Sequence, residues 1–288
     1  MKIIRKELKF YWTMIKPLQT GLLLLTGITG FISSRCSVIN FVKFSGLTLS
    51  LFLTIAGTTI LNMVFDHDID LKMLRTMRRP IPSGKVKVKE ALLMGTIMCL
   101  VGLILAFMLS LLYGILIFAG ILFDILVYTI LLKRKTSWSI FWGGISGAMP
   151  ILAGRTLGTG SIDTIGIMFA LSILLWIPTH IMTFNMLYFN DYKNAGIPTF
   201  PSKYGFKNTR MVIALSSIGA SIAIGIGITA LGLSWGYLRL LAILSAGLLG
   251  LAIMSVLKPS EKINFGLFKY ASLYMLIAML LTTIGSVS

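Results

Sequence analysis

Apolar residues recur along the whole chain in runs of about 20, and short polar stretches separate the runs. A helix needs about 20 predominantly apolar residues to cross the hydrocarbon core of a bilayer. The pattern therefore predicts an all-α polytopic membrane helix bundle, organised as a single transmembrane domain over residues 1–288. We expect nine transmembrane helices, with approximate ranges 18–34, 42–66, 91–109, 112–132, 140–157, 164–187, 210–231, 238–256 and 266–285.

The composition supports a lipid bilayer as the surroundings of the chain. Hydrophobic residues make up 56% of the sequence and charged residues 12%, whereas a soluble domain carries about 25% charged residues. A net charge of +17 is also typical of nucleic-acid-binding proteins. Here the basic residues lie in the short gaps between apolar runs, as the positive-inside rule requires. We therefore expect no nucleic-acid partner.

The distribution of Lys and Arg predicts the orientation in the membrane. Of the 26 basic residues, 22 lie in the N-terminal segment, in alternate gaps between the expected helices, or just beyond such a gap. The opposite gaps hold only Arg35, Lys43, Arg155 and Arg239. Because cytoplasmic loops carry the excess of Lys and Arg, we expect the N-terminus in the cytoplasm and the C-terminus outside. This orientation requires an odd number of spans, and the plasma membrane is the expected location.

Acidic residues are few, and three of the nine lie together at the end of the second expected helix. Asn62, Asp66 and Asp70 have i, i+4, i+8 spacing, so on a helix they share one face, with Asp68 pointing elsewhere. Two carboxylates and an amide oxygen are hard ligands that suit Mg²⁺. The alternative is a solvated acidic helix end that nearby arginines neutralise. Acids in a membrane chain more often indicate function.

A basic segment follows these acids, and two prolines prevent it from continuing the helix. Arg75 and Arg79 lie in this segment, and arginine matches the geometry of phosphate oxygens. Acids for a metal beside arginines for phosphate form the layout that a diphosphate site needs. As an alternative, the arginines serve only as topology signals. Asp191, in a second loop on the same predicted side, is a candidate ligand for a second Mg²⁺.

Several segments between about residues 12 and 205 together resemble one known family. The segments are Lys16-Pro17, Asn62-x-x-x-Asp66-x-Asp68-Ile69-Asp70, Met73-x-Arg75-Thr76-x-x-Arg79-Pro80, Tyr128-Thr129 with Leu132-Lys133-Arg134-x-Thr136, Gly143-Gly144-x-x-Gly147-Ala148-x-Pro150, and His180 with Asp191-Tyr192-x-x-Ala195-Gly196-Ile197-Pro198. In this combination they resemble the UbiA superfamily of intramembrane prenyltransferases, most closely the protoheme IX farnesyltransferases, also called heme O synthases.

The resemblance implies an activity for the protein and roles for several of these residues. It implies farnesyl transfer from farnesyl diphosphate to a vinyl group of heme B, with Mg²⁺ as the cofactor. The implied catalytic and metal-binding residues are Asn62, Asp66, Asp70 and Asp191. The implied diphosphate-binding residues are Lys16, Arg75, Arg79, Tyr128 and Lys133. His180 would contact heme, as an iron ligand or a propionate partner; the alternative is a hydrogen-bonded packing residue.

Two other functions stay open at this point. Another member of the superfamily would transfer a prenyl group to a quinone precursor or an archaeal lipid. A transporter would need buried charges near the bilayer centre and an internal repeat, whereas most acids here lie at helix ends.

Docking to partner enzymes of respiratory heme maturation is a further possibility. The sequence assigns no role to Asp124, in the middle of the fourth expected helix.

Overall fold

The computed structural model describes residues 9–35 and 41–287, and it is all-helical over that part of the chain. Three of the basic residues that predict the orientation, Lys2, Arg5 and Lys6, lie outside the described residues. The helices are α2 (Pro17–Ile32), α3 (Phe41–Phe65), α4 (His67–Lys72), α5 (Val88–Leu109), α6 (Leu111–Ile121), η1 (Leu122–Leu132), α7 (Ser139–Thr159), α8 (Thr164–Leu187), α9 (Phe189–Asn194), α10 (Phe200–Ala230), α11 (Trp235–Leu257) and α12 (Glu261–Val287).

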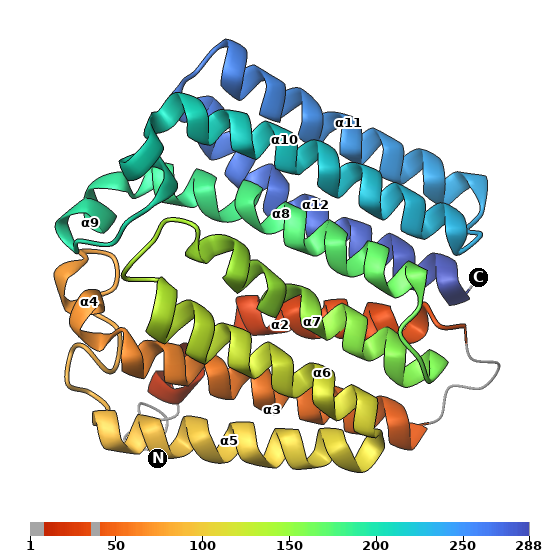
Figure 1. The fold of residues 1–288 in the computed structure, drawn as a ribbon, viewed down its shortest axis with the longest axis horizontal. Helices are drawn as coiled ribbons and strands as arrows, with labels where there is room; N and C mark the ends of the chain where they lie inside the picture. The colour runs from red at the N-terminus through yellow and green to blue at the C-terminus, as the bar shows by residue number, and fades with distance from the viewer. Residues whose placement is uncertain (1–8, 36–40, 288) are drawn as a thin grey trace.

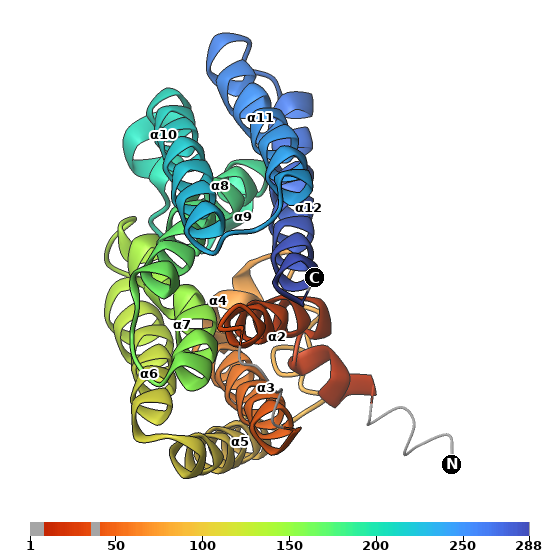
Figure 2. The same ribbon diagram turned by 90° about the vertical axis from the view of Figure 1, so that its right-hand side faces the viewer.

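The long helices run side by side, and the two short helices α4 and α9 lie together at one end of the bundle (Figure 1). Seen along the helices, α2 lies in the interior and contacts α3, α7 and α12 (Figure 2). Each of the nine predicted ranges coincides with a long helix, or with α6 continued by η1. The predicted membrane bundle is therefore confirmed.

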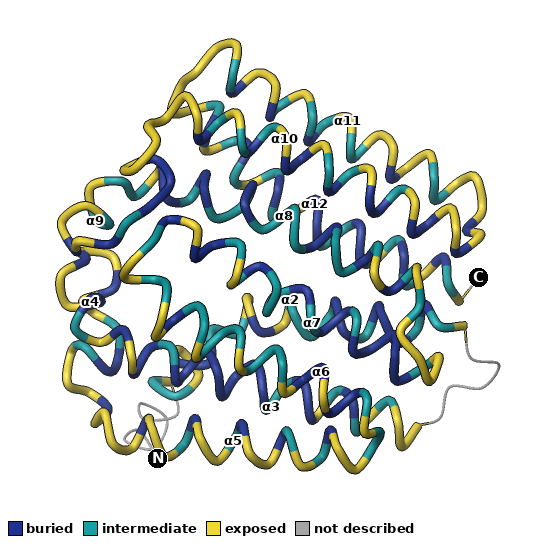
Figure 3. Tube along the Cα trace, viewed as in Figure 1, coloured by how far each residue is buried: buried dark blue, intermediate teal, exposed yellow. Residues whose placement is uncertain are grey.

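Seven helical segments of the described chain are long and apolar enough to cross a membrane. The two other predicted spans are α2, which has only 16 residues, and α7, which contains Arg155 and does not qualify. The count of nine spans therefore stays a prediction. Exposed residues follow the outer faces of α5 and α11 (Figure 3). Many of these are large and apolar, such as Leu93, Ile104 and Ile243, as a bilayer requires.

The second half of the fourth predicted span is a π-helix rather than an α-helix. This segment, η1, carries the wider i→i−5 hydrogen bonding, and it ends with a bond of 2.8 Å from the Lys133 amide to the Tyr128 carbonyl. With five-residue hydrogen-bonded turns, residues four or five positions apart lie on one face. Asp124, Tyr128 and Lys133 have these spacings and therefore share a face of η1.

Close helix packing holds α2 against α7. The backbones approach at Gly30 and Gly154, where an added Cβ atom at Gly154 would lie 3.1 Å from the Phe31 amide nitrogen. Small residues allow such an approach in membrane proteins. Near the C-terminal end of α7 the Arg155 guanidinium is buried. It donates to both carboxylate oxygens of Asp163, at 2.6–2.9 Å, and at 2.6 Å to the Ser33 carbonyl.

Candidate active site

The helix break between α3 and α4 places the first acidic cluster at the end of the bundle. Asp66 stands between the two helices, with φ −96° and ψ 5°. The i→i−4 bonds nevertheless continue across the break, from the Asp66 amide to the Asn62 carbonyl at 3.0 Å and from the Asp70 amide to the Asp66 carbonyl at 2.8 Å. The three predicted ligands therefore keep one common face, as their spacing requires.

Each carboxylate of this cluster has a basic partner. Lys133, directly after η1, donates to one oxygen of buried Asp66. Arg79 donates to both oxygens of buried Asp70, at 3.0 and 2.8 Å. These two pairs join the acidic face to two of the predicted diphosphate-binding residues.

Asp68 lies apart from this face, as predicted. Its two oxygens accept hydrogen bonds of 2.8 Å from the Arg134 guanidinium, and its side chain is 46% exposed. The Arg134 hydrogen bond holds the pKa of the Asp68 carboxyl below its usual value. Asp68 therefore pairs with Arg134 away from the face that Asn62, Asp66 and Asp70 share.

Asn62 contacts η1 through both ends of its amide. The amide nitrogen donates to an Asp124 carboxylate oxygen at 2.9 Å, and the amide oxygen accepts from the Thr129 hydroxyl at 2.7 Å. The same hydroxyl lies 2.8 Å from the Asp124 carbonyl oxygen. Asp124, whose role the sequence does not indicate, is therefore the direct partner of a predicted metal ligand.

Lys16 belongs to the same cluster and adopts an uncommon backbone conformation. Its φ of 45° lies in the left-handed region, which non-glycine residues rarely adopt and which often indicates a functional constraint. Burial, together with the nearby cations Arg79 and Lys133, lowers the pKa of Lys16 to about 8, against the opposing charges of Asp70 and Asp66. The backbone therefore holds a third cation beside the acids.

The second loop reaches the cluster through α9. Residues Ile69 and Met73 of the first loop pack with Ala195 and Ile197 of the second. The Arg75 amide donates to the Asp191 carboxylate at 3.4 Å. The two predicted loops therefore meet, although the acids of the first loop and Asp191 form no common group.

Two aromatic side chains, those of Phe184 and Tyr188, contact the Arg75 guanidinium. The Arg75 guanidinium carbon lies 4.8 Å from the ring centroid of Phe184 and 5.2 Å from that of Tyr188. Such cation–π contacts fix the guanidinium without using its N–H groups. These donors therefore remain free to bind phosphate oxygens.

Tyr192 is a site residue to which the sequence analysis assigned no role. Burial raises the pKa of its hydroxyl, whereas the charges of Arg75, Lys133 and Arg79 oppose the rise, and Asp66 adds to it. The phenol therefore lies among the cations and remains a hydrogen-bond donor. Its place beside Asp191 in the second loop motif was the available signal.

The donor set fits Mg²⁺. Asp66 Oδ1 is buried and accepts no hydrogen bond from the described residues, so it is an open ligand oxygen. The described residues include no group of three or more His, Cys, Asp and Glu side chains around one point. Mg²⁺ does not need such a group, because it commonly uses one or two carboxylates and completes its shell with water and substrate phosphates. Asn62, Asp66 and Asp70 can supply that protein share.

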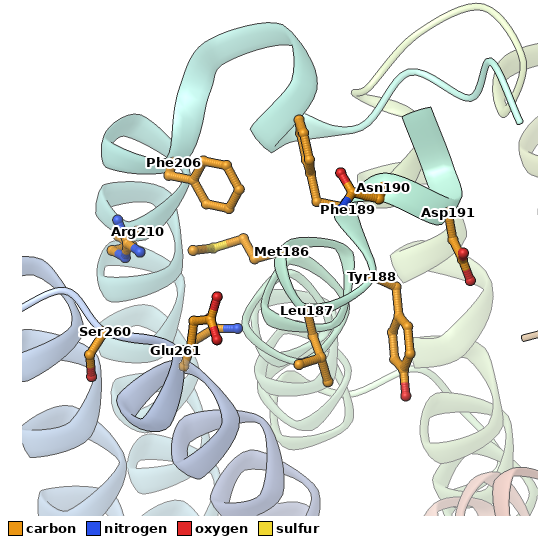
Figure 4. Close-up of a pocket in the computed structure, with 11 residues that line it drawn as sticks. Met186, Leu187, Tyr188, Phe189, Asn190, Asp191, Phe206, Arg210, Ser260 and Glu261 are labelled. Atoms are coloured by element: carbon orange, nitrogen blue, oxygen red, sulfur yellow. The ribbon is translucent and has the colours of Figure 1, made fainter. Parts of the chain in front are cut away.

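A cavity of about 380 Å³ opens beside Asp191, between the ends of α8, α10 and α12. In Figure 4, Tyr188 and Asp191 lie on one side, and Phe206, Arg210 and Glu261 lie on the other. The size suits a small organic ligand. Neither Asp66 nor Asp70 lines this cavity, so the acidic cluster lies outside it.

His180 is held between two aromatic rings in the interior of the bundle. Trp176 stacks at a centroid distance of 5.0 Å and Phe268 at 4.9 Å. The Ser272 hydroxyl lies 3.2 Å from His180 Nδ1 and donates its one hydrogen to the Phe268 carbonyl at 3.0 Å. In the tautomer in which Ser272 accepts from Nδ1–H, the lone pair of the neutral imidazole lies on Nε2.

Comparison with known proteins supplies the family. A family model described as the UbiA prenyltransferase family matches residues 23–280, nearly the whole chain. The chain belongs to the UbiA prenyltransferase family. Many relatives of this UbiA-family enzyme are named protoheme IX farnesyltransferase. One from Archaeoglobus fulgidus is 41% identical over 74% of both chains, and one from Aeropyrum pernix is 35% identical over 92% of this chain and 88% of its own length.

Solved structures support the same fold. A structure of digeranylgeranylglyceryl phosphate synthase in membranes has a TM-score of 0.81 and 23% identity, covering 98% of this chain and 99% of that one. A UbiA homologue from Archaeoglobus fulgidus, bound to geranyl diphosphate (GPP) and Mg²⁺, has a TM-score of 0.69 and 14% identity, covering 95% of this chain and 99% of that one. The predicted family, enzyme class and UbiA-like bundle are confirmed, and the chain is an integral membrane prenyltransferase.

Proposed function

We propose that this enzyme transfers a farnesyl group from farnesyl diphosphate to a vinyl group of protoheme IX (heme B), forming heme O. Two lines of support differ in kind. The clustering of Lys16, Arg79 and Lys133 around Asp66 and Asp70 supports a diphosphate site. The names of relatives over most of the chain support the acceptor.

The observation that carries the proposal is the pairing of each buried acid with a cation. The Asp66–Lys133 and Asp70–Arg79 pairs compensate the charges of both carboxylates. When farnesyl diphosphate enters, its oxygens can bind Lys133 and Arg79 in place of the carboxylates. Asp66 and Asp70 are then available to bind the metal ion. The site is thereby prepared for a ligand that brings negative charge and Mg²⁺ together.

In this mechanism the chain positions and shields the reacting groups. Lys16, Arg75, Arg79, Lys133 and the hydroxyls of Tyr128 and Tyr192 would bind diphosphate oxygens. Mg²⁺, when bound by Asn62, Asp66 and Asp70 and at a second position by Asp191, supplies positive charge to the leaving group. Preorganised cations stabilise the charge that grows on the diphosphate as the allylic C–O bond breaks.

The bond changes then involve the acceptor. The C–O electron pair leaves with the diphosphate, and the vinyl π electrons form the new C–C bond to farnesyl C1. Water adds to the resulting cation on the heme side chain and releases one proton to the diphosphate or to solvent. Apolar helices around the site keep water from the farnesyl cation until the C–C bond has formed.

His180 is proposed to contact heme, and its surroundings favour an iron ligand over a propionate partner. With Nδ1–H bonded to Ser272, Nε2 offers a lone pair rather than a proton. A lone pair binds iron but cannot donate a hydrogen bond to a carboxylate. A metal-bound histidine usually donates its other N–H in this way.

Location and partners extend the proposal. From the distribution of Lys and Arg we propose the plasma membrane, with the N-terminus and both active-site loops in the cytoplasm. Enzymes of respiratory heme maturation are proposed as partners on that side. The alternative acceptor, a quinone precursor or an archaeal lipid, finds some support in the fold shared with digeranylgeranylglyceryl phosphate synthase.

The acceptor is tested with purified protein, heme B, farnesyl diphosphate and Mg²⁺, followed by chromatography and mass spectrometry. We expect a farnesylated heme that requires all three components. Prenylation of a quinone precursor or a lipid alcohol, without a farnesylated heme, would overturn the proposed acceptor while leaving prenyl transfer in place.

The metal site is tested with Asp66→Asn, and Asp68→Asn is the matched control on the same helix end. Asp66→Asn should abolish Mg²⁺-dependent turnover, because Lys133 holds the one remaining oxygen and the amide nitrogen replaces the open ligand oxygen. Asp68→Asn should retain most activity, because Asp68 pairs with Arg134 away from the acidic face. Equal activity of the two variants would contradict the ligand assignment.

A further inference from the structure

Asp124 is a carboxylate in the middle of an apolar span, and no role has yet been assigned to it. It lies in the helical segment Leu111–Leu132, whose mean hydropathy is 2.6. Ionisable groups are costly within a membrane, and they usually face the bundle interior and have a function there. Asp124 faces inward, because its carboxylate accepts a hydrogen bond from Asn62 of α3.

The π-helix explains how this carboxylate reaches Asn62. Asp124 and Tyr128 of η1 share one face with Lys133, which directly follows η1 and pairs with Asp66. Isolated π-helical turns are uncommon and frequently lie at functional sites. Asp124 therefore contacts the acidic face at Asn62, and Lys133 contacts the same face at Asp66.

The hydrogen bonds also determine which way the Asn62 amide points. The Asn62 nitrogen donates to the Asp124 carboxylate, so the nitrogen faces Asp124 and the amide oxygen faces Thr129. The Thr129 hydroxyl can donate or accept and therefore suits either amide orientation. Only the Asp124 carboxylate therefore distinguishes the two orientations of the Asn62 amide. The Asn62 oxygen accepts one bond from Thr129 and keeps a second lone pair for another ligand.

From this geometry we propose that Asp124 is a positioning residue of the metal site, which orients Asn62 so that its amide oxygen is presented to Mg²⁺. The inference rests on the proposed metal site and adds a residue to it. Without Asp124 the amide can reverse and present its nitrogen, which cannot bind a metal ion. Partners that orient metal ligands typically contribute about 10–100-fold to metal affinity.

The test measures binding of Mn²⁺, as a substitute for Mg²⁺, by electron paramagnetic resonance in the presence of an unreactive thiodiphosphate analogue of farnesyl diphosphate. Asp124→Leu should lower Mn²⁺ affinity by about tenfold or more. Asp124→Asn keeps the size of the side chain and one acceptor, so it should lose less. Affinity within twofold of the wild type in both variants would overturn the proposal.

A double-mutant cycle distinguishes positioning from a direct effect of charge. Because Asp124 acts through Asn62, the variant Asn62→Ala/Asp124→Leu should bind Mn²⁺ as weakly as Asn62→Ala alone. Additive losses would overturn the positioning role. Asp66→Asn provides the separate check on the metal site, since it must lose Mn²⁺ binding. No Mn²⁺ binding by the wild type would overturn the metal site and this inference together.

Discussion

At the residue scale, Lys16 is a cation in surroundings that disfavour its charge. Burial and the neighbouring cations lower its pKa to about 8. A bound diphosphate would favour the charged form and raise this pKa, so binding takes up a proton. By linkage, affinity for the thiodiphosphate analogue should be constant well below pH 8 and fall, by up to about tenfold per unit, above it.

Calorimetric titration between pH 6.5 and 9.5 measures this dependence. Lys16→Arg keeps a permanent charge and should remove the fall above pH 8, whereas Lys16→Gln should bind weakly at every pH. If Lys16→Arg shows the same fall as the wild type, another group carries the titration.

Ser272 provides a second residue-scale prediction, from the part of the chain in which the sequence shows only hydrophobic spans. Ser272→Ala removes the acceptor for His180 Nδ1–H, so ferric heme B should bind about 10–100-fold more weakly and lose its histidine-ligated absorption spectrum. Ser286→Ala is the matched control, because its hydroxyl donates to the Thr282 carbonyl within its own helix. Unchanged spectra in Ser272→Ala would argue against iron ligation by His180.

At the element scale, the contact between α2 and α7 depends on glycine. A Cβ atom at Gly154 would clash with the Gly27 carbonyl. Gly154→Ala should therefore cost about 1–3 kcal/mol through overpacking, which lowers the thermal unfolding temperature in detergent. Gly225→Ala in α10 meets nothing within 4 Å and should be neutral or slightly stabilising, because alanine favours the helix. Equal stability of the two variants would show that the helices separate without cost.

Periodicity predicted the long elements well and their local irregularities poorly. The span predicted at 164–187 coincides with α8, because an apolar run in a bilayer has few structural alternatives. The π-hydrogen bonding of η1 was not predictable, because its sequence is as apolar as that of an α-helical span. The start of α10 was not predictable either: the helix begins at Phe200, ten residues before the predicted 210. It has a kink at Gly205, where φ is 77°.

The candidate site was predictable to the same extent. Helical spacing placed Asn62, Asp66 and Asp70 on one face, because the i→i−4 bonds continue through the break at Asp66. The pairing of Asp66 with Lys133 was not predictable, since it depends on how α3 packs against η1. The same packing gives Asp124 its partner, so spacing along one helix could not show it.

At the scale of the whole molecule, the count of spans decides on which side of the membrane the acids lie. Helix α7 is the critical element, because it lies outside the seven strongest candidates and carries the buried Arg155. A buried arginine does not prevent α7 from spanning. The guanidinium is bonded to Asp163 and Ser33 near one end of the helix, so its charge is compensated there.

If α7 spans, the exposed residues Lys135 and Ser161 that flank it lie on opposite sides of the membrane. Single cysteines at these positions, in a chain whose Cys36 and Cys99 are replaced by serine, test this with a membrane-impermeant maleimide. Ser161→Cys should react in intact cells, and Lys135→Cys only after permeabilisation, because the basic loops are cytoplasmic. Reaction of both from outside would mean that α7 does not cross, and the reverse pattern would put the acidic face outside the cell. Either result would separate the diphosphate site from cytoplasmic substrate.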